Sequence, residues 1–277
     1  MHGPRVTVLL PTYNRAEILP ACIRKVISQD FSDWELIILD DCSDDRTPDI
    51  AHEYAVLDNR IFYHRNTVRK GTPVNRNAGI DQSRGELIFF IEDDLTLDPA
   101  CLKLLVETYD SLKDTKPVGG VMPRLIEGGA ASPEVNCENP MIFNRFTGEV
   151  FSNYSVICDH VVQTLSMHAC SLYPKAVLES VGGYSSRYTG NYYREETDLD
   201  FRILRKGYTF FYNSRAFGYH NPIPRGSWKQ IHRRMMTYYI IRNHVVFVVS
   251  TFGVRALYMV PFYFLTIVWR RLRILAN

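Results

Sequence analysis

Residues 6–15 read Val-Thr-Val-Leu-Leu-Pro-Thr-Tyr-Asn-Arg. A largely apolar run that ends at a proline and polar residues is typical of a buried strand leading into a loop. A helical pattern of apolar side chains follows over residues 18–27. The alternation continues with apolar runs at 35–39, 61–64 and 86–91 and a helical pattern at 72–83. Four such strands separated by helical stretches predict an α/β fold: a mostly parallel sheet with right-handed crossovers.

The second half of the chain has a less regular pattern. Gly207 is a typical stop signal for the helix expected before it. We expect a helix over residues 99–113, a strand over 118–122, a loop over 127–139, a hairpin over 141–155 turning at Thr147-Gly148, a strand within 164–173, a helix over 176–181, a helix over 195–206 and a strand over 209–212.

Charge is distributed unevenly along the 277 residues. Residues 1–200 hold 30 acidic and 19 basic residues, whereas residues 201–277 hold 13 basic residues and no acidic one. This asymmetry indicates that the C-terminal part meets an anionic ligand or surface. With 46% hydrophobic and 22% charged residues the chain can bury a core, which excludes global disorder. We expect no nucleic-acid partner.

The six cysteines are scattered and form no C-x-x-C pair. This spacing excludes an obvious zinc module and predicts reduced, cytosolic thiols rather than a disulfide framework. The first strand begins at Val6, which leaves no room for a signal peptide before it. We therefore expect the protein on the cytoplasmic side.

Two acidic clusters follow strands of the predicted sheet. Asp40 and Asp41 end the second strand, and Glu92-Asp93-Asp94 follow the fourth. Parallel sheets place ligands beyond the carboxyl ends of their strands. Carboxylates gathered there suit Mg²⁺ or Mn²⁺ holding a diphosphate. The chain has neither G-x-G-x-x-G nor G-x-x-x-x-G-K-[ST], which disfavours a dinucleotide or P-loop site.

These blocks together resemble a known family. Residues 6–15, the Leu-Asp-Asp-Cys-Ser-Asp-Asp segment, Asn-Arg-Asn-Ala-Gly at 75–79, Phe-Ile-Glu-Asp-Asp, Val-Gly-Gly-Tyr at 181–184 and Glu-Glu-Thr-Asp-Leu at 195–199 are similar, in this order, to family 2 glycosyltransferases of the GT-A fold. The resemblance covers roughly residues 5–245. It implies transfer of a sugar from a nucleotide-diphosphate donor with a divalent metal, Mn²⁺ or Mg²⁺, and inversion at the anomeric carbon.

The resemblance also implies roles on the donor side. Tyr13 and the Pro11 backbone are expected to flank the donor base, and Asp41 to bond its ring N–H. Arg76 resembles a basic residue near the base or diphosphate, with a salt bridge to Asp41 or Asp93 as the structural alternative. In the metal motif Asp94 is the expected metal ligand and Asp93 lies nearer the ribose or sugar. The family's metal motif is D-x-D. Glu92 stands where that motif has its first aspartate, and the role of Glu92 stays open.

On the acceptor side the family's base block usually reads Glu-Asp, and here it reads Glu195-Glu196. Glu196 aligns with the base that deprotonates the acceptor, with Glu195 as the alternative. His220 is a candidate metal ligand or a structural histidine. His168 is a candidate wall of the acceptor pocket or a core residue. The stretch 187–194, with Tyr193 and Arg194, resembles an acceptor-site lid or an ordinary loop.

The C-terminal segment carries apolar runs at Val245–Val249 and Ala256–Trp269 beside several arginines. Each run is shorter than the roughly 20 residues of a spanning helix, which favours interfacial helices on an anionic membrane over a true span. The alternative is that the same apolar runs form an interface between copies of the chain in a homo-oligomer. We expect a catalytic domain over 1–225 and a membrane-association segment over 226–277.

The sequence thus predicts an inverting, metal-dependent glycosyltransferase at the cytoplasmic face of a membrane, with a lipid-linked or surface-glycan acceptor. One alternative keeps the fold and makes polyprenyl phosphate itself the acceptor. Another class is a non-catalytic nucleotide-sugar-binding scaffold, which the carboxylates at Asp41, Asp94 and Glu196 disfavour.

Overall fold

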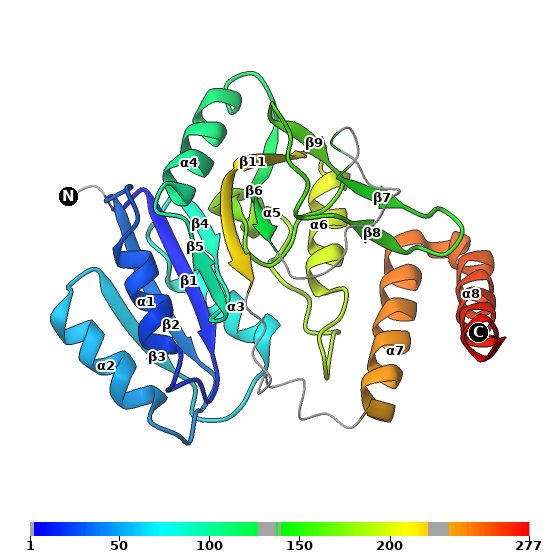
Figure 1. Cartoon of the computed structure of the whole chain (residues 1–277), viewed down its shortest axis with the longest axis horizontal. Coiled ribbons are helices and arrows are strands. Elements are labelled where there is room, and N and C mark those ends of the chain that lie inside the picture. The colour runs from blue at the N-terminus through cyan, green and yellow to red at the C-terminus, as the bar shows by residue number, and fades with distance from the viewer. Residues whose placement is uncertain (1–2, 127–136, 138–139, 221–232, 277) are drawn as a thin grey trace.

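The computed structural model describes residues 3–126, 137, 140–220 and 233–276 (Figure 1). Its main sheet has the strand order β3-β2-β1-β4-β10-β6-β11-β5, with β9 paired to β11. The strands are β1 (Val6–Thr12), β2 (Trp34–Asp40), β3 (Ile61–Arg65), β4 (Leu87–Phe90), β5 (Leu95–Leu97), β6 (Val118–Ile126), β9 (Val162–Thr164), β10 (Leu172–Pro174) and β11 (Thr209–His220).

The N-terminal half of the sheet is parallel, as predicted. β1 pairs in parallel with β2 and β4, and β2 with β3, so that Thr12 lies opposite Asp40. The carboxyl ends of these strands therefore meet at one edge, where the acidic clusters follow. β10 runs antiparallel to β4 and β6, which makes the whole sheet mixed.

Helices cover both faces of the sheet because side chains alternate along each strand. Val8 and Leu10 of β1 face the cluster formed with α1 (Leu19–Ile27), α2 (Thr47–Leu57) and α4 (Cys101–Leu112). Leu9 faces the opposite cluster, which includes residues of α3 (Thr72–Gln82), α5 (Lys175–Ser180) and α6 (Glu195–Arg205). The result is a three-layer α/β arrangement (Figure 1).

Three segments differ from the sequence prediction. The expected strand within 164–173 is two short strands, β9 and β10, separated by a loop that carries His168. The strand expected over 209–212 continues to His220, because β6 supplies a partner along that length. β5 was not predicted, since three residues are too few to show a period. The expected loop over 127–139 lies almost entirely outside the described residues.

The predicted hairpin is confirmed. β7 (Met141–Phe143) pairs antiparallel with β8 (Val150–Ser152), and Gly148 in the turn has a φ of 74°. A side chain at Gly148 would collide with Val248, so the turn can pack closely on the C-terminal helices only as glycine.

The C-terminal segment forms two helices, α7 (Arg233–Phe252) and α8 (Ala256–Ala276), joined by a short 3₁₀ turn. The two apolar runs were expected to be too short to span a membrane, but flanking tyrosines, threonines and arginines extend each into a helix of 20 or 21 residues. By length and composition, the stretch Arg234–Arg270 is a candidate membrane span, and 28% of its most apolar window is buried.

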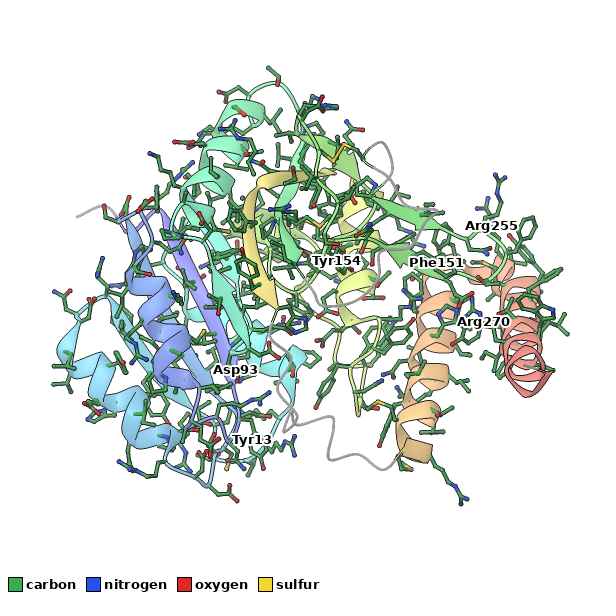
Figure 2. All side chains as sticks on the ribbon, viewed as in Figure 1. Tyr13, Asp93, Phe151, Tyr154, Arg255 and Arg270 are labelled. Carbon is green, nitrogen blue, oxygen red and sulfur yellow. A yellow bond between two sulfur atoms is a disulfide. The ribbon has the colours of Figure 1, made fainter. Side chains whose placement is uncertain are left out.

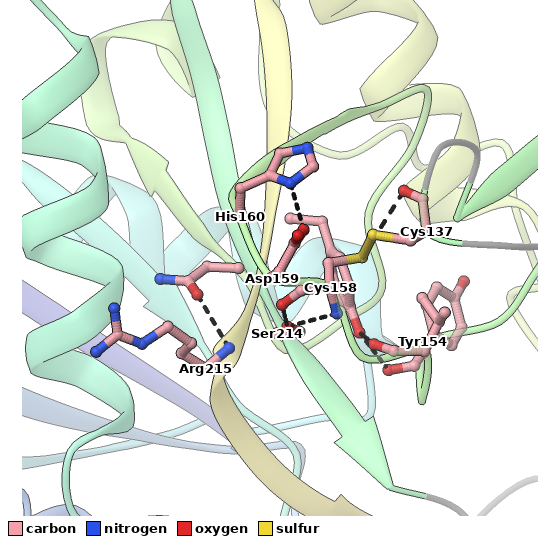
Figure 3. Close-up of a disulfide and its surroundings, with 10 residues drawn as sticks. Cys137, Tyr154, Cys158, Asp159, His160, Ser214 and Arg215 are labelled. Carbon is pink, nitrogen blue, oxygen red and sulfur yellow. Dashed lines mark hydrogen bonds and ion pairs between the residues drawn. A yellow bond between two sulfur atoms is a disulfide. The ribbon is translucent and has the colours of Figure 1, made fainter.

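The prediction that all cysteines are reduced is wrong for one pair. Cys137 and Cys158 form a disulfide, and Figure 3 shows it beside Ser214 of β11. Ser214 Oγ accepts a hydrogen bond from the Cys158 amide and donates one to the Cys158 carbonyl. Tertiary structure brings the two Cα atoms to 5.4 Å across 21 residues of sequence, a proximity that cysteine spacing does not reveal. The other four cysteines are free thiols.

Candidate active site

One cavity of about 550 Å³ lies at the carboxyl edge of β1, β2 and β4. Its lining combines the end of β1 and the turn after β4 with the loops before α3 and α6, and Figure 2 labels Tyr13 and Asp93, which both line it. All twelve site residues singled out in the sequence line it: Pro11, Tyr13, Asp41, Arg76, Asp93, Asp94, His168, Tyr193, Arg194, Glu195, Glu196 and His220. The structure therefore brings both acidic clusters and the Glu195-Glu196 pair to a single site.

Asp41 is a buried carboxylate that is fixed by the loop before α3. Its Oδ1 accepts hydrogen bonds from Asn66 Nδ2 and the Lys70 amide, and its Oδ2 accepts one from the Gly71 amide at 2.9 Å. A carboxylate has about four acceptor positions. Arg69 Nε lies 3.9 Å from Oδ2, beyond hydrogen-bond distance, so one acceptor position at Oδ2 is left for a donor group in the cavity.

Two tyrosines line the cavity near Asp41. The Arg69 guanidinium carbon lies 4.1 Å from the centre of the Tyr13 ring, which fixes that ring beside the cavity. Gly71 has a φ of 87°, and a side chain there would meet the Tyr192 hydroxyl. Tyr192 thus packs directly on the glycine, and the loop before α6 reaches the part of the cavity beside Asp41.

Glu92, Asp94 and His220 form a group that can hold a metal ion. Their ligand atoms all lie within 4.8 Å of one another, and His220 Nε2 is 3.5 Å from Asp94 Oδ2. Two carboxylates and one imidazole suit Mn²⁺ and also Mg²⁺. The antiparallel pairing of β5 with β11 places His220 opposite Leu95, beside the acidic turn. That pairing, invisible in the sequence, brings His220 to the acidic turn, where Glu92 joins Asp94 and His220 in the group.

Asp93 points to a different set of partners. It accepts a hydrogen bond from Thr12 Oγ1, and its Oδ2 lies 3.2 Å from Arg15 Nε. Burial raises the pKa of Asp93 to about 6, although Arg15 acts in the opposite direction. Arg15 and Thr12 were not singled out in the sequence. Their place at the end of the run of residues 6–15 was their only signal.

Asn75, Asn77 and Gly79 of the 75–79 block each have a distinct contact. Asn75 Nδ2 donates to the Leu39 carbonyl, and Asn77 exchanges hydrogen bonds with the backbone of Tyr184. A side chain at Gly79 would lie 2.6 Å from a Leu39 methyl carbon, so α3 packs this closely on the sheet only with glycine there. The block therefore fixes α3 against β2 and against the Gly182-Gly183 turn.

Arg76 is 1% exposed and is surrounded by carboxylates. Its Nη1 lies 2.9 Å from Glu195 Oε1 and 3.0 Å from Glu196 Oε1, and its Nη2 lies 3.6 Å from Glu92 Oε1. The salt bridge to Asp41 or Asp93 considered in the sequence is wrong, because α6 brings its own acids to the guanidinium. Arg76 links the metal-binding group to the Glu195-Glu196 pair.

The two glutamates differ in accessibility. The Glu195 side chain is 4% exposed, and burial together with Glu196 raises its pKa. The Glu196 side chain is 25% exposed, so it can meet a substrate in the cavity. Both begin α6, whose N-terminal dipole favours negative charge.

His168 lies in the loop between β9 and β10. Its Nε2 is bonded to the Pro123 carbonyl at 2.8 Å, its ring packs edge-on against Tyr154, and burial lowers its pKa to about 4. The loop is fixed by Asp200 of α6, which accepts hydrogen bonds from Ser166 Oγ and the Met167 amide. His168 is thus a buried residue and a wall of the cavity at once.

The loop before α6 is held by α7. Asn243 Nδ2 donates to the Thr189 carbonyl and to Asn191 Oδ1, and Arg242 donates to the Arg187 carbonyl. On α8, Arg270 Nη1 lies 2.8 Å from Glu149 Oε1 in the β7–β8 turn (Figure 2). The C-terminal helices therefore support two elements that line the cavity.

A family model described as Glycosyl transferase family 2 matches residues 7–161. The chain belongs to this family. A curated member, GalNAc(5)-diNAcBac-PP-undecaprenol beta-1,3-glucosyltransferase of Campylobacter jejuni, is 27% identical over 220 residues, which is 77% of this chain and 63% of that protein. The chain spans less than two thirds of the length of the curated relatives it matches first.

Solved structures of the GT-A fold are similar to this family 2 chain over most of its length. The structure of S. aureus TarS 1-349 in complex with UDP-GlcNAc has a TM-score of 0.63 at 16% identity, covering 94% of this chain and 71% of that one. The mannosyltransferase PcManGT from Pyrobaculum calidifontis, in complex with GDP-Man and Mn²⁺, has a TM-score of 0.59 at 18% identity, covering 90% and 65%. At these identities the likeness shows the fold.

Proposed function

We propose that this family 2 glycosyltransferase moves a sugar from a nucleotide-diphosphate donor to an acceptor hydroxyl, with inversion and with a divalent metal. The observation that supports this most is Arg76, because one guanidinium contacts both Glu92 of the metal-binding group and Glu196 of the acceptor side. A displacement needs both ends at one reacting centre: a stabilised leaving group and a base for the nucleophile.

The donor would lie along the carboxyl edge of the sheet. Asp41 Oδ2 accepts from a ring N–H of the base, and Tyr13 and the Pro11 backbone flank that base. Asp93 is held by Arg15 and Thr12 and faces the ribose or sugar. Two similar structures are complexes with UDP-GlcNAc and GDP-Man, and uracil and guanine both present such an N–H.

Asp94, Glu92 and His220 would hold Mn²⁺ or Mg²⁺, which when bound neutralises the charge that develops on the leaving diphosphate. Glu196 accepts the proton of the acceptor hydroxyl as its oxygen attacks the anomeric carbon from the face opposite the diphosphate. Arg76 is a positioning residue that holds Glu196 and offsets the charge of buried Glu195.

We propose further that the protein acts at a membrane surface on its cytoplasmic side. α8 exposes Leu257, Phe262, Leu265, Val268 and Trp269, and the chain after Asp200 carries only basic charges. An apolar face beside cationic side chains is the combination that binds anionic lipid. A lipid-linked acceptor fits this location, and the name of the Campylobacter relative includes undecaprenol.

A ligand panel tests the donor assignment. Thermal unfolding of the protein is followed with UDP, GDP, UDP-GlcNAc and GDP-Man, each with and without Mn²⁺, because a ligand that binds only the native state raises its stability. A shift with one nucleotide that requires Mn²⁺ supports the proposal. A stabilised protein that never transfers or hydrolyses the sugar would favour the non-catalytic scaffold instead.

A further inference from the structure

Arg194 is a buried arginine that has no carboxylate partner in the part of the chain that the structure describes. It immediately precedes α6, has a φ of 75°, is 6% exposed and lines the active-site cavity. Its Nε is buried without a hydrogen-bond partner, and among the described residues its side chain makes no hydrogen bond and no ion pair. Its guanidinium carbon lies 4.5 Å from the Tyr193 ring centre and 5.8 Å from that of Phe247.

The described residues around Arg194 thus leave its positive charge without a carboxylate. Buried charges are normally paired, and aromatic faces offset only part of the lost hydration. Arg76 in the same cavity has three carboxylate neighbours. Glu149, on the nearby β7–β8 turn, is already bound by Arg270 and by Thr147 Oγ1. The left-handed backbone at Arg194 is a further cost that a binding role would explain.

We propose that Arg194 binds a phosphate group of the acceptor, close to the hydroxyl that Glu196 deprotonates. The guanidinium fork matches phosphate oxygens in pairs. Arg194 and Glu196 are separated by one residue and line one cavity, so a phosphate bound by Arg194 shares that cavity with the reacting hydroxyl. The inference rests on the proposed function and narrows the acceptor to a molecule that carries a phosphate group.

The surroundings of Arg194 favour a phosphate that carries a lipid. Phe247 belongs to α7, whose buried face packs with Met259 of α8. The phosphate site therefore lies where the catalytic cavity meets the two helices whose outer face is apolar. A soluble sugar phosphate offers the same group without the lipid, and the two sources can be separated by experiment.

The test measures binding of glucose 1-phosphate, farnesyl phosphate and farnesol to the full chain by calorimetry. Saturating nucleoside diphosphate and Mn²⁺ fill the donor side first, so that a phosphate probe cannot bind there. We expect both phosphates, but not farnesol, to bind the wild-type protein. Tighter binding of farnesyl phosphate points to a lipid acceptor, and tighter binding of glucose 1-phosphate points to a soluble one.

The variants are Arg194→Gln, Arg194→Lys and a matched control, Arg187→Gln, an exposed arginine in the same loop. We expect Arg194→Gln to weaken phosphate binding at least about tenfold, Arg194→Lys to lie between, and the control to stay near wild type. Arg194→Lys keeps the charge and covers the case in which the glutamine variant does not fold.

A folded Arg194→Gln or Arg194→Lys variant that binds the phosphates as tightly as the wild-type protein would overturn the inference. It would also be overturned if the wild-type protein bound farnesol as tightly as farnesyl phosphate, or bound neither phosphate. Nucleoside-diphosphate affinity is measured in the same samples. If the wild-type protein binds no nucleoside diphosphate, the proposed function itself fails. If the protein binds a nucleoside diphosphate but neither phosphate probe, only the role proposed for Arg194 fails.

Discussion

The Arg76 guanidinium on α3 lies 2.9 Å from Glu195 Oε1 on α6, and both side chains are almost fully buried. The two residues are 119 positions apart in the sequence. This ion pair joins the parallel half of the sheet, through α3, to the helix that carries the candidate base. Removing one partner leaves the other charge buried, which is far costlier than losing an exposed pair.

We therefore expect Arg76→Met to lower the free energy of unfolding by about 3–5 kcal/mol, the range for breaking a buried pair. The control is Lys103→Met, which removes an exposed partner of Glu107 on α4 and should cost less than about 1 kcal/mol. Urea unfolding of both variants measures the difference. Similar values for the two would mean that Arg76 does not neutralise these acids.

Asp94→Asn should abolish the dependence of nucleoside-diphosphate binding on Mn²⁺. Asp94 belongs to the only group of described residues found able to hold a metal, and a neutral amide is a much weaker ligand than a carboxylate. Asp44→Asn is the control, since Asp44 is exposed and outside the cavity. Titration with and without EDTA gives the readout. Metal-dependent affinity that survives in Asp94→Asn contradicts the assignment.

Asp200 predicts a pH dependence of stability. Burial raises its pKa from 3.8 to about 7, partly offset by hydrogen bonds from Ser166 and Met167. Because the folded state then binds the proton of Asp200 more tightly than the unfolded state, the contribution of Asp200 to stability falls as pH rises from about 4 to about 7 and levels off above. Asp200→Asn should flatten this slope. Glu195 acts in the same direction, so some slope remains.

Unfolding midpoints between pH 4.5 and 8 test this directly. The expected result is that the wild-type and Asp200→Asn curves converge at low pH and separate towards neutral pH. Parallel curves would mean that the Asp200 carboxylate titrates at the same pH in both states.

The membrane proposal predicts co-sedimentation with anionic vesicles that is stronger than with neutral ones and is weakened, but not abolished, by high salt. Leu257→Glu combined with Leu265→Glu should release the protein, because both leucines are exposed on α8. The control is Val56→Glu, an exposed apolar residue on α2. These substitutions are cleaner than deleting 246–277, since Phe247 and Val248 form a buried cluster with Tyr188. Wild-type protein left in the supernatant at low salt would refute the proposal.

The sequence predicted the first four strands and the edge of the sheet where the acidic residues meet, because a buried parallel strand is a continuous run of apolar residues. It also named twelve residues that line one cavity. It could not predict partners that come from distant parts of the chain. Arg76 was assigned the wrong acids, Glu92 had no role, and the Cys137–Cys158 bridge was missed. In each case the partner is supplied by tertiary packing, which a local pattern does not contain.

The C-terminal helices show the same limit in another way. Composition identified the apolar and basic character of 226–277, but not that Asn243 holds the loop at Thr189. Hydrogen bonds from a helix to a distant backbone carbonyl leave no signature in the sequence. The contact of α7 with the cavity loop was therefore visible only in the structure.

The central claim is that Glu196 is the base of a sugar transfer. The most direct test is release of labelled sugar from the donor identified in the ligand panel, measured for wild type, Glu196→Gln and Glu195→Gln. We expect Glu196→Gln to lower turnover by about 10²-fold or more, with unchanged affinity for the nucleoside diphosphate. Near-normal turnover in Glu196→Gln, or a wild-type protein that releases sugar from none of the donors, would contradict the account.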